Sequence, residues 1–161
     1  MMTMKNDMFL RFENVSEFFV VGCSMEMSLT NFKPAEVWQK FMQSKNKLTD
    51  SDTECYYDVN SYHEHYFESY SPDKPFNKLA GVKSTAVVDN FDSLVIPDGR
   101  YAVFIHEGSA ADISKTFQYI FAIWLPQNNE QLDHRPHFMK LPIDYNRDSS
   151  IVKEEIYIPL K

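Results

Sequence analysis

The apolar residues between Val95 and Pro126 follow a strand pattern first and a helix pattern afterwards. Gly99 marks a turn, and the apolar, aromatic run from Tyr101 to His106 is typical of a half-buried strand. Apolar residues then recur at helical spacing, at Ile113, Phe117, Ile120, Phe121 and Trp124. The pattern therefore predicts a strand and then a helix that ends at Pro126, because proline lacks the N–H that the next turn would need.

The start of this predicted helix carries a capping pattern. Ser109 can cap the first turn, and Asp112 follows three residues later in a variant of the capping box. A carboxylate there also interacts favourably with the positive end of a helix. We therefore expect Ser109 to cap the second helix.

The same order of elements occurs earlier in the chain. A strand is predicted from Phe18 to Leu29, followed by a helix that begins at Pro34, ends near Ser44, and has on one face Val37, Trp38, Phe41 and Met42. The other apolar or alternating segments predict strands over 8–12, 55–62, 79–88, 137–143 and 154–160. Gly81, inside one of these strands, predicts a bulge or a close approach of two backbones.

Each half of the chain thus has the order β-α-β-β, which indicates an internal repeat. Two such units predict an α+β fold with antiparallel sheets, a pseudo-two-fold axis between the halves, and helices on one side. A ligand cleft is expected where the halves meet. We expect one domain over residues 1–161, with the first repeat at about 8–90 and the second at about 95–161.

The strand over 55–62 has two chemically different faces. Cys55, Tyr57 and Val59 share one face, and the other carries Tyr56, Asp58, Asn60 and Tyr62. We expect the first face to be buried and the second to be a platform for a ligand. A slip of one residue would exchange the faces and put Tyr56 in the place of Tyr57.

Composition narrows the function classes. The formal net charge is −7, and no basic stripe is visible, so a direct nucleic-acid partner is not expected. The chain contains 13 Phe and 9 Tyr, which could line a cavity or simply fill the core; both interpretations stay open. No stretch approaches the roughly 18 apolar residues of a membrane span, and the N-terminus has no apolar leader.

The cysteine content indicates a reducing compartment. Cys23 and Cys55 are the two cysteines, and neither lies in a CxxC motif. We expect reduced thiols in a cytoplasmic protein, with a disulfide between them as the open alternative.

An ordered set of segments along the chain resembles the GyrI-like small-molecule-binding domain. The segments are FFVVGCSM, VWQKFM, FNKLAGV, IPDGRYAVFIHEG, TFQYIFAIWLP and EEIYIPLK, and they extend from Phe18 to the C-terminus. This domain is also the effector-binding domain of AraC-type and MerR-type multidrug-sensing regulators. The resemblance implies a duplicated β-α-β-β fold with a ligand cleft between the halves, here in a stand-alone form.

One position departs from the family pattern. In the family, the strand after the second helix usually carries a buried Glu that meets cationic drugs, and Met139 occupies that place here. A thioether offers dispersion and weak sulfur–aromatic contacts but no charge. We therefore expect neutral or apolar aromatic ligands to be preferred over cations.

The same departure bears on catalysis. Some stand-alone relatives are hydrolases that use a Glu in the cleft as a general base, and Met139 cannot abstract a proton. Glu154 or Glu155 could substitute, although two adjacent strand carboxylates are more typical of an exposed surface. No P-loop, dinucleotide fingerprint or nucleophile elbow is present, so no catalytic residue is predicted and binding is favoured over an enzyme.

The histidines are weak candidates for a metal site. His63 and His65 alternate, and His134 and His137 are close in sequence, but each pair supplies two ligands where a metal site needs three or four. Structural or exposed histidines are favoured, with no metal and no cofactor. His106 differs, because it follows its strand at the mouth of the second helix, where the resemblance places cleft-lining residues.

The candidate ligand-binding residues come from both halves: Trp38, Tyr57, Tyr62, His106, Phe117, Trp124 and Met139. For the two tryptophans and Phe117, ordinary core packing is the competing interpretation. The predicted partner is a hydrophobic or aromatic small molecule.

Three functions remain open. The favoured one is a sensor or sequestering module for aromatic or amphiphilic ligands; the alternatives are a hydrolase of small xenobiotics and a gyrase-inhibitor-like protein that binds DNA gyrase. Fewer than about twenty residues precede the first repeat, which is too few for a helix-turn-helix domain. A role in transcription regulation would therefore require a separate regulator as partner.

Overall fold

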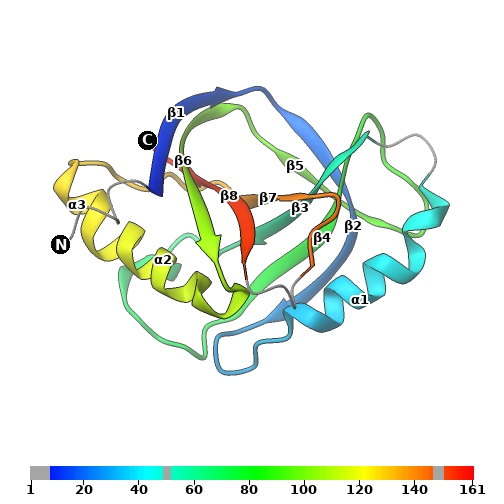
Figure 1. The fold of residues 1–161 in the computed structure, drawn as a ribbon, viewed down its shortest axis with the longest axis horizontal. Coiled ribbons are helices and arrows are strands. Elements are labelled where there is room, and N and C mark those ends of the chain that lie inside the picture. The colour runs from blue at the N-terminus through cyan, green and yellow to red at the C-terminus, as the bar shows by residue number, and fades with distance from the viewer. Residues whose placement is uncertain (1–7, 49–51, 147–150) are drawn as a thin grey trace.

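One antiparallel sheet connects all the strands that the structure describes (Figure 1). The structure is a computed structural model that describes residues 8–48, 52–146 and 151–161. The strands are β1 (Phe9–Val15), β2 (Phe18–Met27), β3 (Asp52–Ser61), β4 (Phe76–Ser84), β5 (Asp92–Ile96), β6 (Gly99–Gly108), β7 (His137–Pro142) and β8 (Val152–Pro159). Their order across the sheet is β1-β6-β8-β7-β3-β4-β2-β5. The predicted α+β fold with an antiparallel sheet is confirmed.

The first helix follows β2, and the second helical segment follows β6. They are α1 (Pro34–Ser44), α2 (Ile113–Tyr119), a π-helical turn (Ile120–Trp124) and α3 (Leu125–Gln127), with 3₁₀ turns at Lys45–Lys47, Tyr66–Glu68 and Ala110–Asp112. Pro34 begins α1, where its missing N–H costs nothing because the first helical N–H groups have no partner within the helix.

The four strands counted inward from one edge of the sheet correspond in order to the four strands counted inward from the other edge. From one edge it is β1, β6, β8, β7, and from the other it is β5, β2, β4, β3. β5 was not predicted, and it pairs with β2 of the first half, whereas β1 pairs with β6 of the second. Each edge strand therefore crosses to the other half, and the pseudo-two-fold relation between the halves stays a prediction.

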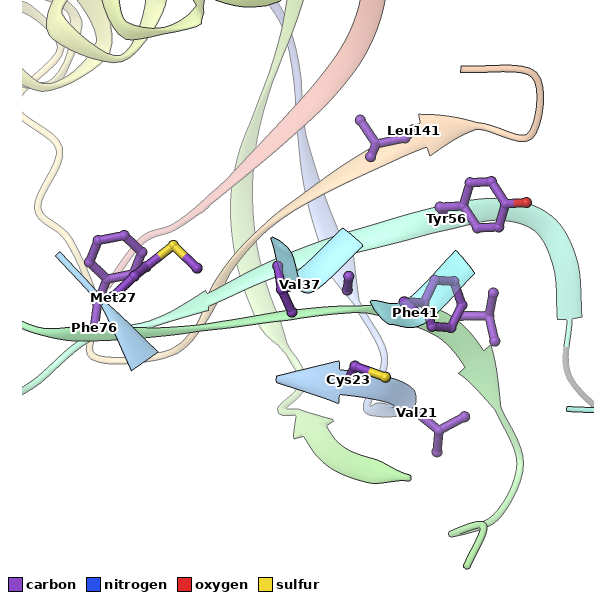
Figure 2. Packing of buried hydrophobic residues seen from close by; sticks show 10 residues of the cluster. Val21, Cys23, Met27, Val37, Phe41, Tyr56, Phe76 and Leu141 are labelled. Carbon is purple, nitrogen blue, oxygen red and sulfur yellow. The ribbon is translucent and has the colours of Figure 1, made fainter. Parts of the chain in front are cut away.

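Two apolar cores lie on the same face of the sheet, one under each helix. Leu141 of β7 belongs to the core under α1, and Met139, two residues away on the same strand, packs against the core under α2. Figure 2 shows the α1 core, built from Val21, Cys23, Met27, Val37, Phe41, Tyr56, Phe76 and Leu141 among others. The α2 core contains Ala102, Phe104, Tyr119, Ile120, Trp124, Leu125, Ile156, Ile158 and Leu160.

A third core fills the opposite face. It contains Val20, Tyr57, Val59, Leu79, Ile96, Tyr101, Val103, Phe138 and Tyr157. The two faces of β3 are divided as predicted, with Tyr56 on the helix face and Tyr57 on the other, but both side chains are buried. The two cysteines also lie on opposite faces, Cys23 in the α1 core and Cys55 against the third core.

Two glycines bring β2 and β4 together. Gly22 and Gly81 face each other in the strand register, and a Cβ on Gly81 would lie 2.2 Å from the carbonyl oxygen of Val21. The close approach predicted at Gly81 is confirmed, and it requires glycine because there is no room for a side chain.

The start and end of the second helix differ from the prediction. The Ser109 side chain makes no capping hydrogen bond, because a 3₁₀ turn comes first and the Asp112 N–H donates to the Ser109 carbonyl oxygen at 3.1 Å. The helix also continues past Pro126 to Gln127. The π-helical turn before it has a wider hydrogen-bond pattern, which accommodates a residue that lacks an N–H.

Candidate functional site

Four polar side chains and Met139 form a strip between the two cores on the helix face. From β6 to β4 it consists of His106, Glu154, Met139, Asp58 and Lys78, and we call these five residues the junction strip. His106 and Glu154 are cross-strand partners, as are Met139 and Asp58. All are buried except Met139, which is half-buried. α1 and α2 lie over the two halves of the sheet (Figure 1), each with its own core beneath it.

The Asp58 carboxylate is held by two donors. The Lys78 ammonium donates to Oδ1 at 2.5 Å, and the Trp38 indole N–H donates to Oδ2 at 2.9 Å. Both charged side chains are at most 6% exposed. The ion pair compensates the negative charge of Asp58, and the indole bond ties α1 to β3.

Glu154 is the one buried acid of the strip that has no cation paired with it among the described residues. Its side chain is 4% exposed, and its Oε2 has no hydrogen-bond partner within the described part of the chain. Burial raises the pKa of Glu154, and a hydrogen bond with the Tyr145 side chain acts in the opposite direction. The strip thus presents a carboxyl oxygen with unused hydrogen-bonding capacity.

His106 has a structural connection to the start of α2. Its Nδ1 lies 2.8 Å from the Thr116 hydroxyl, and its Nε2 lies 2.9 Å from the Ser109 carbonyl oxygen. Because a carbonyl oxygen can only accept, Nε2 is the donor, which leaves Nδ1 to accept from Thr116 in the neutral ring. Both ring nitrogens are therefore engaged within the fold.

A cluster of aromatic rings adjoins the strip and links the two halves. Tyr62 lies 4.6 Å from Tyr66 and 4.9 Å from His137 between ring centroids. Phe67 stacks on His137 at 5.3 Å and lies 5.2 Å from Phe121 of the π-helical turn. The 3₁₀ turn after β3 therefore reaches across to the second helix.

Burial in this cluster changes the ionisation of its members. It raises the pKa of the Tyr62 hydroxyl and lowers the pKa of His137 to about 3, with the Arg135 charge adding to the second effect. His137 is therefore neutral at physiological pH.

Five of the sequence-predicted residues lie on the helix face at or beside the strip. Trp38 contacts Asp58, Met139 and His106 belong to the strip, and Tyr62 belongs to the aromatic cluster. Phe117 joins that cluster through Phe121, on which it stacks at 6.1 Å.

The other two predicted residues lie elsewhere. Tyr57 is on the opposite face, 5.4 Å from Phe18 and 6.0 Å from Phe138 between ring centroids. Trp124 lies in the α2 core, stacked on Phe9 at 5.1 Å. The structure does not bring these two residues together with the other five.

The predicted site residues did not include three charged residues of the strip, although Glu154 had been considered as a catalytic residue and Asp58 had been placed on the platform face. The expectation that Glu154 and Glu155 are both exposed is wrong, since neighbouring strand residues point to opposite faces and Glu154 is buried. Asp58 and Lys78 were not identified as a pair. A signal existed for Lys78, because it alternates in register with the apolar residues Phe76 and Ala80.

The remaining candidates give no metal centre in the described residues, where no three His, Cys, Asp or Glu side chains converge as ligands. His63 and His65 follow the end of β3 and are exposed, and His65 pairs with Glu68. No helix in the described part of the chain is long and apolar enough to cross a membrane.

The fold alone does not give a function, and comparison with known families identifies the class of domain. The chain belongs to the family of GyrI-like small-molecule-binding domains, whose model matches residues 8–161. A search of curated protein sequences finds no match.

Solved structures share the fold at low identity. The protein SAV2435 bound to tetraphenylphosphonium is 14% identical with a TM-score of 0.69, over 95% of this chain and 93% of that one. The regulator EcmrR, in a complex with DNA, is 18% identical with a TM-score of 0.66, over 96% of this chain and 58% of that one. An integron cassette protein of Vibrio cholerae is 16% identical with a TM-score of 0.60, over 96% and 98%. Family and fold together make this chain a small-molecule-binding domain.

Proposed function

We propose that the protein binds neutral aromatic or amphiphilic molecules against the junction strip, as a sensor or sequestering module. The observation that carries this proposal is the buried Glu154 carboxyl, whose Oε2 has no partner in the described residues. The half-buried Met139 faces Ile156 in the strand register, two residues from Glu154 along β8. A buried polar atom without a partner is costly, so a ligand group that hydrogen-bonds to it gains affinity.

The charges of the strip favour a neutral ligand. Asp58 is already compensated by Lys78, and burial shifts the pKa of Glu154 towards the uncharged form. Met139, at the position where the family carries a carboxylate, adds no charge. SAV2435 binds a lipophilic cation, whereas the groups at this strip provide little to offset the desolvation of a cation.

The apolar part of the ligand would be held by side chains beside the strip. Trp38 and Phe117 come from the two helices, Tyr62 from the end of β3, and Met139 from β7. Aromatic rings and a thioether favour flat, polarisable ligands, because both make specific contacts with aromatic rings.

The location can be tested through the two tryptophans, which lie at different distances from the strip. The Trp38 indole donates a hydrogen bond to Asp58 in the strip, whereas Trp124 packs in the α2 core. We expect triphenylphosphine oxide to quench tryptophan fluorescence in Trp124→Phe, which retains Trp38, and to leave it unchanged in the matched variant Trp38→Phe. Quenching of Trp124 alone, or of neither residue, would contradict the proposed location.

A second experiment, with an aromatic ligand that contains an ester, separates binding from hydrolysis. We expect thermal stabilisation that grows with ligand concentration, since a ligand that binds the folded state stabilises it by mass action. Mass spectrometry should then recover an ester-containing aromatic ligand intact. Accumulation of its hydrolysis products would favour an enzyme instead.

A further inference from the structure

The Phe67 ring lies among four other rings of the aromatic cluster. Their centroids are 4.9 to 5.3 Å from that of Phe67, and they belong to Tyr62, Tyr66, Phe121 and His137. The His137 ring is parallel to Phe67 within 11°, and the two tyrosines meet Phe67 edge to face, at 67° and 70°. Stacked and edge-to-face contacts are the arrangements that aromatic rings prefer. We call these four residues the ring cage, because together they surround one flat ring.

Phe67 is the ring that borders solvent. It is 43% exposed, whereas His137 is only 6% exposed. Because His137 is stacked against Phe67, one face of its ring is covered by a side chain that itself reaches the surface. Movement of the Phe67 side chain alone would therefore open this face of the ring cage to an incoming molecule.

The backbone beside Phe67 is held independently of its side chain. The Lys74 ammonium donates to the carbonyl oxygens of Tyr66 and Ser69, at 3.0 and 2.9 Å. Within the same 3₁₀ turn, the Glu68 N–H donates to a carbonyl oxygen of the preceding loop at 3.2 Å. Rotation of Phe67 between its side-chain rotamers leaves all these hydrogen bonds in place. The ring can therefore leave the cage without unfolding of the turn.

The charges around the ring cage disfavour a cationic ligand. The Lys74 ammonium lies over the Tyr66 ring, 5.7 Å from its centre. Burial and the Arg135 charge both lower the pKa of His137, so this ring is neutral at physiological pH. The acid on the turn, Glu68, is exposed and hydrogen-bonds with the His65 ring. A neutral, flat aromatic ring thus fits the cage best.

We propose that Phe67 is an internal plug of the ring cage, and that a flat, neutral aromatic ring of the ligand takes its place. Phe67 rotates outward when the ligand binds, and the ligand ring stacks on His137 and Phe121. This inference rests on the function proposed above and adds to it a competition between the ligand and a side chain of the protein. Phe67 weakens binding, since the apparent affinity falls with the fraction of molecules whose cage is open.

Isothermal titration with quinoxaline, a flat molecule that is neutral at physiological pH, tests the plug. We expect Phe67→Ala to bind quinoxaline about tenfold more tightly than the unmodified chain, because its cage is already open. Phe12→Ala removes a similarly exposed phenylalanine on β1, outside the cage, and should bind as the unmodified chain does. Equal or weaker binding by Phe67→Ala, or binding by neither protein, would overturn the proposal, since Phe67 would then be a wall of the site or purely structural.

A second variant tests the location. Phe67→Ala/Phe121→Ala lacks a ring on which the ligand stacks, so we expect it to lose most of the gain in affinity. NMR amide shifts of Phe67→Ala with quinoxaline should centre on Phe121 and His137. A gain kept in full by the double variant, or shifts confined to the opposite face of the sheet, would also overturn the proposal.

The plug and the proposed function fail in different ways. Triphenylphosphine oxide that quenches Trp38, together with unchanged quinoxaline affinity in Phe67→Ala, would refute the plug alone. A gain in Phe67→Ala that requires Phe121, without any quenching of Trp38, would support the plug and refute the location at the junction strip.

Discussion

The Lys78 ammonium lies 2.5 Å from Oδ1 of Asp58, and both side chains are almost completely buried. The removal of one charge would leave the other buried without compensation, and this is far costlier than the removal of both. We expect Lys78→Met to lower the free energy of unfolding by about 3–5 kcal/mol. Urea unfolding measures this loss directly.

The double variant Lys78→Met/Asp58→Asn separates pairing from packing. It leaves no uncompensated charge, and the Asn amide can still accept the Trp38 hydrogen bond. We therefore expect it to recover a large part of the stability that Lys78→Met loses. A single variant that costs less than about 1 kcal/mol would show that the pair is not buried as described.

The buried His137 predicts a loss of stability in mild acid. Because burial lowers its pKa from 6.5 to about 3, the folded state stays unprotonated while the unfolded state gains a proton as the pH falls below 6.5. The contribution of His137 is thus present above pH 6.5 and declines below it by up to about 1.4 kcal/mol per pH unit. Urea unfolding between neutral pH and mild acid should show this slope, and His137→Gln should flatten it.

The exposed His63 provides the control for this slope. His63→Gln removes a histidine but leaves the buried ring in place, so its pH dependence should match that of the unmodified chain. If His137→Gln retained the full slope, His137 would not be its source.

Glu154 predicts a pH effect of the opposite sign. Its pKa is raised by burial, so its contribution to stability is full below the ordinary pKa of a glutamate and is lost as the pH rises through the raised pKa of the folded state. We expect Glu154→Gln to be more stable than the unmodified chain at neutral pH and nearly equal to it in acid. Thermal unfolding at both pH values tests this; an equal effect at both would contradict it, and the exposed Glu64→Gln should change neither.

The facing glycines of β2 and β4 predict a steric effect. A Cβ on Gly22 would lie 1.9 Å from the Ala80 carbonyl oxygen, which is backbone and cannot move aside freely. We expect Gly22→Ala to destabilise the fold by about 3 kcal/mol. Denaturant unfolding measures it, with Thr85→Ala in the exposed loop after β4 as a control that stays within about 0.5 kcal/mol. A Gly22→Ala protein of unchanged stability would mean that the strands are not so close.

Local patterns in the sequence predict the local structure well. The bounds of α1 at Pro34 and Ser44 and the division of β3 into two faces follow from apolar spacing, because that spacing records which side chains are buried. β5 was missed because it is a short edge strand with a single buried residue, Ile96. The crossing of β1 and β5 to the opposite halves is a long-range pairing, which local spacing does not encode.

The candidate site was predictable in its apolar part only. Trp38 and Tyr62 were predicted because they are aromatic, and Met139 was predicted because it occupies the position of the family Glu. Glu154 was not chosen as a site residue because the sequence alone does not show which of two adjacent strand carboxylates faces the helices. The pairing of Asp58 with Lys78 joins residues 20 apart in sequence, so it becomes visible only when β3 and β4 are placed side by side.

The most direct test of a neutral-ligand site at the junction strip compares a cation with a neutral molecule of similar shape. Isothermal titration of the unmodified chain and of Met139→Glu would use tetraphenylphosphonium and triphenylphosphine oxide. The account predicts that the unmodified chain prefers triphenylphosphine oxide and that Met139→Glu, which adds a carboxylate, shifts the preference towards tetraphenylphosphonium. Binding of tetraphenylphosphonium to the unmodified chain about tenfold or more tightly than triphenylphosphine oxide would contradict it.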